Sequence, residues 1–508
     1  MSVAADPAPR PLDHLTEFGA NGDSALVLRG STLSYRELRD RVARLSAWLR
    51  HCVPAPGARV ASWAAKGELT CLLPLAAARA GLVHVPVNPL LKRAQVAHIL
   101  GDCGASLLIG NSARLASLEP GDVPPGCAVL EETAAMIEAA AWAGALPPSL
   151  ADVGELAAIL YTSGSTGRPK GVMLSHANMW LGAVSVAHYL NLEADDVTLA
   201  VLPLSFDYGQ NQLLSTWRAG GCVVPLDYLF PRDVAKACAS YGVTTLAAVP
   251  PLWVQLVELD WPGEASAPLR RLTNSGGALT EDLVRKLRGL FPQARLFPMY
   301  GLTEAFRSTY LDPMMVDTHP TSMGKAIPFA EILVIDDDGR IAANGQEGEL
   351  VHCGPLVAQG YWQDAERTAE RFKPAPSQAQ YQGMAVWSGD RVRRDADGLL
   401  YFVGRRDAMI KSAGNRISPQ EIEDAAVATG LVAEAVALGV SDPRLGQAVH
   451  LVARAAPDVP DAAERLPRAL IQELPNFMQP QQIHWRDAMP VNPNGKLDRT
   501  ALAQEYGA

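Results

Sequence analysis

Paired cysteines, clusters of basic residues and long apolar runs are all missing from this sequence. The seven cysteines are scattered, odd in number and never spaced as Cys-x-x-Cys, so neither a disulfide framework nor a zinc site is expected. A reducing, cytoplasmic location fits this pattern. The net charge is −10, from 44 Lys and Arg against 54 Asp and Glu. Nucleic acid and anionic membranes are therefore not expected as partners.

The most apolar stretch is too interrupted to cross a membrane. It covers residues 69–87, and Pro74, Arg79, Gly81 and His84 all fall inside it. A buried helix followed by a buried strand accounts for it. The amino terminus lacks the apolar core of a signal peptide, so secretion is not expected.

The chain does have enough apolar sequence for several cores. Its 508 residues are 48% hydrophobic and 19% charged, which is typical of a folded protein. At roughly 150 residues per domain, this length predicts two to four structural units. Residues 35–50 carry Leu38, Val42, Leu45 and Leu49 at helical spacing and predict an amphipathic helix. Alternating strand and helix patterns continue to about residue 297 and predict mainly parallel sheets covered by helices.

The sequence changes character after residue 330. Strand patterns at 332–335 and 348–352 flank the turn sequence Asp-Asp-Asp-Gly-Arg, which predicts a hairpin in a β-rich module. A charged, turn-rich segment follows Gly404, and an α+β pattern follows that. We therefore predict an α/β protein with two domains. The first, residues 1–406, combines helix-covered sheets with the β-rich module, and the second, residues 407–508, is a small α+β domain.

A loop rich in glycine and hydroxyl side chains predicts a phosphate site. It reads Tyr-Thr-Ser-Gly-Ser-Thr-Gly-Arg-Pro-Lys over residues 161–170, directly after an apolar strand and before a helical pattern. Glycine lets backbone N–H groups approach phosphate oxygens, and the lysine adds positive charge. The spacing is not that of a Walker A loop, and a flexible surface loop is the alternative. The candidate phosphate ligands are Thr162, Ser163, Gly164, Ser165, Thr166, Gly167 and Lys170.

Further motifs follow in the order found in one known family. They are Met299-Tyr-Gly-Leu-Thr-Glu304, Gly348-Glu-Leu, Ser388-Gly-Asp390, Gly404-Arg-Arg-Asp407-Ala-Met-Ile-Lys411 and Asn494-Gly-Lys496-Leu-Asp-Arg. With the loop, they resemble the adenylate-forming enzymes, which include acyl-CoA synthetases, stand-alone adenylation domains and luciferase. The resemblance covers nearly the whole chain. It implies that a carboxylate reacts with ATP to give an acyl adenylate, and that the acyl group then passes to a thiol.

The resemblance also implies a nucleotide shell for ATP. Tyr300 would stack on the adenine, opposite a strip of backbone that carries no large side chain. Asp390 would accept hydrogen bonds from both ribose hydroxyls, with Arg405 beside it. The backbone strip consists of Gly276, Gly277 and Ala278.

Catalytic and moving parts are implied in the same way. Thr303 would donate to the α-phosphate, and Glu304 would coordinate Mg²⁺. Lys496 would bridge the substrate carboxylate and the α-phosphate, and its alternative is an exposed lysine in a polar tail. The small domain would act as a mobile lid that rotates about Asp407 between the two half-reactions. Gly414 would line the tunnel for the pantetheine arm.

Two charged residues suggest which carboxylate is activated. Asp207, in Phe-Asp-Tyr-Gly, matches the position that binds the ammonium in amino-acid-activating members, and a turn-forming aspartate is the alternative. Arg307 stands where the family usually has a small or apolar residue, and it would hold a second carboxylate. The alternative places Arg307 outside the pocket, paired with a protein carboxylate. The other candidate substrate residues are Tyr208, Asn211, Ser275 and Met299.

We therefore expect an AMP-forming ligase for an acidic or β-amino acid, similar to aspartate. The chain has no Gly-x-Asp-Ser motif for a phosphopantetheine arm, so the thiol is expected from a carrier protein in trans, or from coenzyme A. An acyl-CoA or aryl-CoA synthetase is the first alternative. A non-catalytic adenylate-binding protein is the second, and the full set of catalytic residues argues against it.

Overall fold

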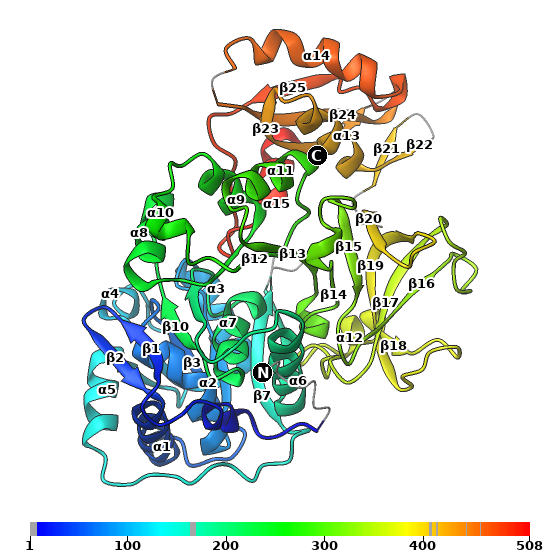
Figure 1. The fold of residues 1–508 in the computed structure, drawn as a ribbon. Coiled ribbons are helices and arrows are strands. Elements are labelled where there is room, and N and C mark those ends of the chain that lie inside the picture. Colours follow the sequence, from blue (N-terminus) through cyan, green and yellow to red (C-terminus); the bar gives the residue numbers. More distant parts are fainter. Residues whose placement is uncertain (1–7, 163–168, 406–408, 413–414, 443, 458) are drawn as a thin grey trace.

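The computed structural model describes residues 8–162, 169–405, 409–412, 415–442, 444–457 and 459–508. Figure 1 shows a large body with a strand-rich part at its right side and a small domain above it. Three sheets organise these parts. Among the described residues, no helix is long and apolar enough to cross a membrane.

The first sheet is mostly parallel and lies in the N-terminal third of the body. Its order is β6-β5-β3-β4-β7-β8. The strands are β3 (Arg59–Trp63), β4 (Val83–Pro86), β5 (Ala105–Gly110), β6 (Ala128–Glu131), β7 (Leu156–Thr162) and β8 (Lys170–Ser175). The helices around it are α1 (Tyr35–Cys52), α2 (Glu68–Ala80), α3 (Arg93–Cys103), α4 (Ser112–Leu115) and α5 (Glu132–Ala141).

Helix α1 shows why the sequence pattern was sufficient here. Leu38, Val42 and Leu49 are fully buried, which confirms the predicted apolar face. The helix begins in a capping box. The Ser34 hydroxyl accepts from the backbone N–H of Glu37 at 3.3 Å, and the Glu37 carboxylate accepts from the backbone N–H of Ser34 at 2.8 Å.

The phosphate-loop segment differs from the prediction in one respect. We expected the loop to connect a strand directly to a helix. Instead, β8 intervenes and pairs antiparallel with β7, so two paired strands flank the loop sequence. The pattern missed β8 because Gly171 and the short apolar run after it have no clear period of two.

The second sheet extends across the body and the strand-rich part. Its order is β16-β17-β19-β20-β15-β14-β13-β12-β11-β9-β10-β1-β2, with β18 on β19. The first strands are β1 (Ser24–Leu28), β2 (Ser31–Ser34), β9 (Val197–Ala200), β10 (Cys222–Pro225), β11 (Thr245–Ala248), β12 (Arg271–Asn274) and β13 (Arg295–Tyr300). The helices on this half are α6 (His176–Tyr189), α7 (Asp207–Arg218), α8 (Pro231–Tyr241), α9 (Pro250–Val257), α10 (Gly263–Ser266) and α11 (Glu281–Leu290).

The predicted β-rich module is present, but it is not a separate sheet. Its strands join the parallel strands through β14 and β15, which run antiparallel to their neighbours. The predicted hairpin is the pair β16 and β17. The elements are β14 (Thr309–Tyr310), β15 (Ser322–Ala326), β16 (Glu331–Ile335), β17 (Glu347–Cys353), α12 (Ala365–Arg371), β18 (Phe372–Pro374), β19 (Met384–Arg394) and β20 (Leu400–Arg405).

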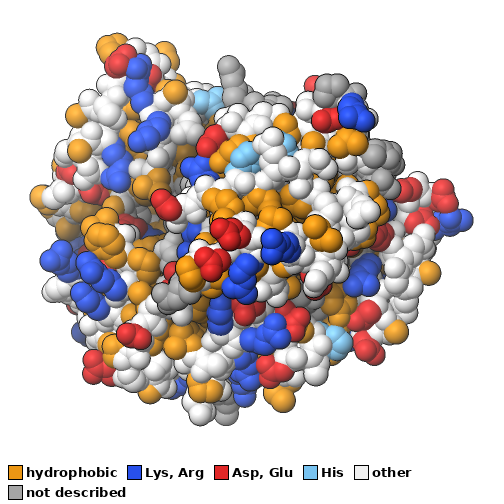
Figure 2. Space-filling view, turned by 90° about the horizontal axis from the view of Figure 1, so that it is seen from above, with side chains coloured by type: hydrophobic (Ala, Val, Ile, Leu, Met, Phe, Trp, Pro, Cys, Tyr) orange, Lys and Arg blue, Asp and Glu red, His pale blue; other side chains and the backbone are white. Residues whose placement is uncertain are grey.

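The small domain has its own sheet, in the order β22-β21-β24-β23 with β25 on β24. Its apolar core is a separate cluster that includes Ile417, Leu451 and Leu466. The predicted boundary at residues 406 and 407 lies outside the described residues. The elements are β21 (Ile410–Ser412), β22 (Asn415–Ile417), α13 (Pro419–Ala428), β23 (Val432–Asp442), β24 (Gly446–Ala455), α14 (Ala462–Glu473), β25 (Gln482–Trp485) and α15 (Arg499–Tyr506). Figure 2 looks down on this end of the molecule, where acidic and basic side chains are intermixed.

Two buried histidines link the stability of the fold to pH. Burial lowers the pKa of His84 and of His352 from 6.5 to about 3. Below about pH 6.5 the unfolded chain therefore binds protons that the folded chain does not, and the free energy of unfolding should fall. The expected slope is at most about 1.4 kcal/mol per pH unit for each histidine, down to about pH 3.

Denaturant unfolding between pH 7 and pH 4 tests this expectation. His84→Gln and His352→Gln should each flatten the loss of stability on acidification, whereas His51→Gln, at an exposed site, should not. An unchanged slope in both buried variants would contradict the assignment.

Candidate active site

The candidate site lies at one edge of the second sheet. The strands β9, β11, β12 and β13 run parallel, so their carboxyl ends meet there. The loop after β12 supplies Ser275 and the glycines beside it, and the loop after β13 supplies Thr303, Glu304 and Arg307. Sequence motifs that lie far apart along the chain are thus brought to a common edge.

The small domain delivers Lys496 to this edge. A tight turn presents the lysine, with the Asn492 N–H donating to the Lys496 carbonyl at 2.7 Å and the Lys496 N–H donating to Asn492 Oδ1 at 3.1 Å. Asn88 of the body holds the turn, because its Nδ2 donates to the Pro493 carbonyl at 2.9 Å. The predicted motif therefore docks on the body instead of forming an exposed tail.

The ammonium of Lys496 packs against both the ring of Phe206 and the backbone of Gly276. Lys496 Nζ lies 4.5 Å from the centroid of the Phe206 ring. Gly276 has φ +83°, and a Cβ there would lie 2.6 Å from Lys496 Cε, so a larger residue would obstruct the lysine. Burial lowers the pKa of Lys496, and the charge of Asp207 partly opposes this shift.

Asp207 and Arg307, two of the residues predicted to bind the substrate, contact each other in the interior of the body. Their side chains are 3% and 2% exposed, and Arg307 Nη1 lies 3.6 Å from Asp207 Oδ2. The Thr303 hydroxyl donates to Asp207 Oδ1 at 2.9 Å. Asp207 is the first residue of α7, where a carboxylate is favoured by the helix dipole, so the alternative of a simple turn residue is wrong.

Arg307 is also held from its other sides. Its guanidinium carbon lies 4.6 Å from the centroid of the Tyr208 ring, and its Nη1 donates to Ser275 Oγ at 3.5 Å. The Tyr208 hydroxyl and the Thr273 hydroxyl lie 2.6 Å apart. Arg307 is paired with a protein carboxylate, as the alternative expected, and it also lines a small cavity with Met299 and Asn211.

A strained turn aims Arg307 into the pocket. Phe306 has φ +59° and ψ −47°, and the Arg307 N–H donates to the Ala305 carbonyl at 2.6 Å, which forms a γ-turn centred on Phe306. The Phe306 ring is fully buried. It fits there because Gly182 of α6 has no side chain, since a Cβ at Gly182 would lie 2.1 Å from Phe306 Cδ1.

Gly182→Ala should therefore displace Phe306 and destabilise the protein. Overpacking of this kind costs roughly 1–3 kcal/mol. Gly289→Ala is the matched control, because Gly289 also lies inside a helix and a Cβ there meets nothing within 4 Å. The control should stabilise the protein by about 1 kcal/mol. Chemical denaturation of both variants measures the difference, and equal effects would contradict the packing role of Gly182.

Lys170, Glu304 and Tyr361 form a second cluster at the start of β8. Lys170 Nζ lies 3.2 Å from Glu304 Oε1, and the Tyr361 hydroxyl lies 2.6 Å from both groups. Burial by itself would raise the pKa of Glu304, but Lys170 and the hydrogen bond from Tyr361 lower it overall. Burial also lowers the pKa of Lys170.

Tyr361 was not predicted from the sequence. Its hydroxyl connects a strand residue and a turn residue that are far from it along the chain. The only local cue is an aromatic pair after Gly360, which is too common to indicate a site.

The residues expected around adenine and ribose are also close together. The Tyr300 hydroxyl donates to Asp390 Oδ2 at 2.6 Å, and Arg405 Nε lies 3.7 Å from Asp390 Oδ1. Burial and the charge of Asp390 raise the pKa of Tyr300 well above its ordinary value. Asp390 and Arg405 face each other on the paired strands β19 and β20.

Several predicted residues lie outside the described residues. They are Ser163, Gly164, Ser165, Thr166 and Gly167 of the phosphate loop, Asp407 of the hinge and Gly414 of the tunnel. Thr162 and Lys170 bracket the loop at the ends of β7 and β8. Gly277 and Ala278 follow β12 as expected, and a Cβ at Gly277 would lie 3.0 Å from Pro250 Cγ.

A fixed metal site is not found in the described part of the chain, where no three His, Cys, Asp or Glu side chains are grouped to hold an ion. Glu304 is the one carboxylate among the residues predicted for phosphate and metal. This fits Mg²⁺, which binds proteins through one or two carboxylates and takes its other ligands from phosphates and water.

This fold is that of an α/β protein in which a small C-terminal domain places Lys496 at the carboxyl edge of the large sheet. The chain matches the family model described as AMP-binding enzyme over residues 18–362, and the model for its C-terminal domain over residues 421–496. The chain therefore belongs to the AMP-binding enzyme family, the adenylate-forming ligases that its motifs resemble.

Individual relatives match nearly the whole chain. It is 32% identical over 501 residues to L-proline--[L-prolyl-carrier protein] ligase of Pseudomonas fluorescens, covering 95% of this chain and 96% of that one. It is 31% identical to feruloyl-CoA synthase of an Amycolatopsis species, covering 94% and 95%. Some curated relatives are far longer, and the chain spans only 6% of the length of the first two.

Solved structures agree on the fold. The ATP-bound structure of MatB from Rhodopseudomonas palustris superimposes with a TM-score of 0.90 at 25% identity, covering 98% of this chain and 99% of that chain. The match includes both domains, so the family resemblance and the predicted fold class are confirmed.

Proposed function

We propose that this protein activates an acidic or β-amino acid with ATP and transfers it to a phosphopantetheine thiol. The observation that carries the proposal is the buried pair of opposite charges, Asp207 and Arg307, which lie 3.6 Å apart and both act on the charge of Lys496. Asp207 suits the substrate ammonium. Arg307 suits a second carboxylate, which leaves the first carboxylate to react.

Charge balance supports an acidic substrate. The three charged side chains Asp207, Arg307 and Lys496 interact with one another and sum to +1. An aspartate-like molecule carries a net charge of −1 and would bring the total charge to zero. A neutral amino acid would leave a net charge of +1 in a buried site. Such an excess is costly because little water is available to solvate it.

The first half-reaction needs a cation where charge develops. A carboxylate oxygen of the substrate attacks the α-phosphorus of ATP, the bond from that phosphorus to the bridging oxygen breaks, and pyrophosphate leaves. Lys496 would stabilise the negative charge that builds on the α-phosphate oxygens, and Thr303 would donate a hydrogen bond there. Mg²⁺ would neutralise phosphate charge when bound, and Glu304 would be its protein ligand.

The nucleotide would be held by the groups already described. Tyr300 would stack on adenine, and Asp390 and Arg405 would face the ribose. Phosphate contacts would come from the loop between β7 and β8. The remaining proposed nucleotide residues are Thr162, Ser163, Gly164, Ser165, Thr166, Gly167, Lys170, Gly276, Gly277 and Ala278.

In the second half-reaction a thiolate attacks the acyl carbon and AMP leaves. We propose a carrier protein as the acceptor, with coenzyme A as the alternative. The similarity to a prolyl-carrier-protein ligase over nearly the full length of both chains supports a carrier protein. Lys496 lies against Phe206 in this structure, so we propose that the small domain rotates to admit the thiol and that Gly414 would line its path.

Asp407→Pro should separate the two half-reactions. Proline fixes φ at the proposed hinge, so adenylation should stay largely intact while thioester formation falls. Asp407→Ala is the control, because it removes the charge but leaves the backbone free. Pyrophosphate exchange reports the first step, and radiolabelled loading of a carrier protein reports the second. Equal loss of both steps in the proline variant would argue against a hinge.

The proposed function is tested most directly by pyrophosphate exchange with three panels of acids. Acidic and β-amino acids should support the fastest exchange, and fatty and aryl acids should give little. A preference for fatty or aryl acids would overturn the proposal.

One observation favours the second candidate, an acyl-CoA or aryl-CoA synthetase. Because Arg307 already lies 3.6 Å from Asp207, the charge of Asp207 is balanced without a substrate ammonium. The similarity to feruloyl-CoA synthase is in line with this alternative. The same three panels decide between the two candidates.

A further inference from the structure

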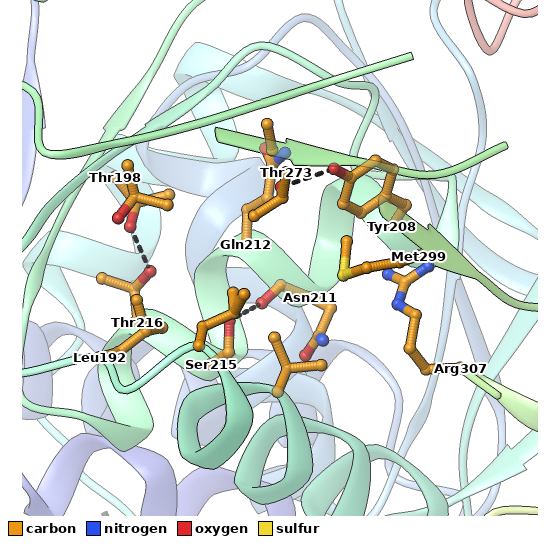
Figure 3. A pocket seen from close by; sticks show the side chains of 14 residues that line it. Leu192, Thr198, Tyr208, Asn211, Gln212, Ser215, Thr216, Thr273, Met299 and Arg307 are labelled. Atoms are coloured by element: carbon orange, nitrogen blue, oxygen red, sulfur yellow. Dashed lines mark hydrogen bonds between the residues drawn. The ribbon is translucent and has the colours of Figure 1, made fainter. Parts of the chain in front are cut away.

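A small cavity with both polar and apolar lining lies among the proposed substrate residues. It measures about 20 Å³ and runs between α6, α7 and the strands β9, β11, β12 and β13 (Figure 3). Arg307 and Tyr208 stand at one end, and Thr198 and Thr216 at the other. A cavity of this size holds about one water molecule, so a larger bound group would need the surrounding side chains to move apart.

Several buried polar atoms of this cavity have no partner among the described residues. Both amide atoms of Gln212 are unpaired, although the residue is only 5% exposed. Asn211 Oδ1, Thr245 Oγ1 and Arg307 Nε are unpaired as well. Since buried polar groups in folded proteins almost always have hydrogen-bond partners, these atoms point to a polar group that binds between them.

The lining also indicates the charge of that group. It contains one guanidinium, amides and hydroxyls, and it contains no Asp or Glu. Hydrogen-bond donors are available from Arg307 Nε, from the Gln212 amide and from the Thr245 hydroxyl. An ammonium would meet no carboxylate in this lining, whereas a carboxylate would meet these donors beside an arginine that Asp207 contacts from its other side. The unpaired acceptors Asn211 Oδ1 and Gln212 Oε1 would remain for water or for the amides to turn.

We infer that this cavity receives the far carboxylate of the substrate, and that Gln212 and Thr245 determine specificity for it together with Arg307. The inference rests on the proposed function in that it concerns the same pocket. It adds that the end group of the substrate is a carboxylate and that Gln212 and Thr245 bind it. Whether Asp207 binds the substrate ammonium is a separate question with a separate test.

Four acids of similar size separate the two questions. Aspartate has an ammonium and a second carboxylate, 2-aminobutyrate has only the ammonium, succinate has only the second carboxylate, and butyrate has neither. The rate of pyrophosphate exchange at low concentration of each acid gives the effect of each group. We expect the second carboxylate to raise this rate at least tenfold in both pairs, which is the effect of one good charge-assisted hydrogen bond.

Variants then test the named residues. Gln212→Leu and Thr245→Val keep the approximate shape of the side chain and remove its polar groups. Each variant should lower the preference for acids with a second carboxylate by up to about tenfold. Gln210→Leu is the matched control, because Gln210 is a buried amide on the same helix that does not line the cavity. Gln210→Leu should leave that preference unchanged. Thermal melting and ATP binding check that each variant is folded.

The outcomes are distinct. The inference is overturned if the second carboxylate has no effect in wild-type protein, or if both cavity variants slow all four acids equally. The proposed function fails by itself if the ammonium gives no advantage while the second carboxylate does. Activation of none of the four acids overturns both.

Discussion

Lys496→Ala is expected to lose adenylation by roughly 100-fold or more, the scale of losing one preorganised donor to a developing charge. The lysine reaches the site on a tight turn that Asn88 holds, and its ammonium lies beside Asp207 and the ring of Phe206. Its removal therefore deletes a positioned cation without disturbing the body. Pyrophosphate exchange measures the loss.

The same variant should still transfer an acyl group from a supplied acyl adenylate to a thiol. Lys496 would have left the site by that stage, so the second step does not depend on its charge. Lys496→Arg should recover part of the first step, and Lys236→Ala, at an exposed helix position, should change neither step. Normal pyrophosphate exchange by Lys496→Ala would show that the turn serves only to dock the small domain.

Arg307→Ala is expected to weaken aspartate-like substrates by roughly 2–5 kcal/mol, the scale for truncating one partner of a buried charge pair. Neutral amino acids of similar size should lose far less, and ATP binding should stay unchanged. Substrate titrations of the exchange reaction, with ATP held constant, give these differences.

Asp207→Ala should instead impair every amino acid, because each presents an ammonium. Arg307 and Asp207 pair with each other in the structure. Removing either side chain therefore leaves the other as a buried charge without its partner. Asp207→Asn and Arg307→Met control for this effect by keeping shape while removing charge. If Arg307→Ala lowers acidic and neutral substrates equally, Arg307 is structural.

The motifs alone were sufficient for the family and for most of the residues that the structure brings together at the candidate site. Lys496 is an example, because its neighbours Asn494 and Gly495 form a tight turn that is encoded locally. Helix α1 is another, because a period of 3.6 and a capping box lie within one stretch of sequence. Local patterns of this kind reflect backbone geometry and do not depend on distant segments.

What the sequence by itself determined is thus the family, the fold class and the identity of the residues that gather at the carboxyl ends of the strands. Only the tertiary structure decided which of them touch. It placed Arg307 against Asp207, joined Tyr361 to Lys170 and Glu304, and left Gln212 unpaired beside a cavity. These contacts connect residues far apart along the chain. Strand order and side-chain packing determine these contacts, and the local periodicity of the sequence encodes neither of them.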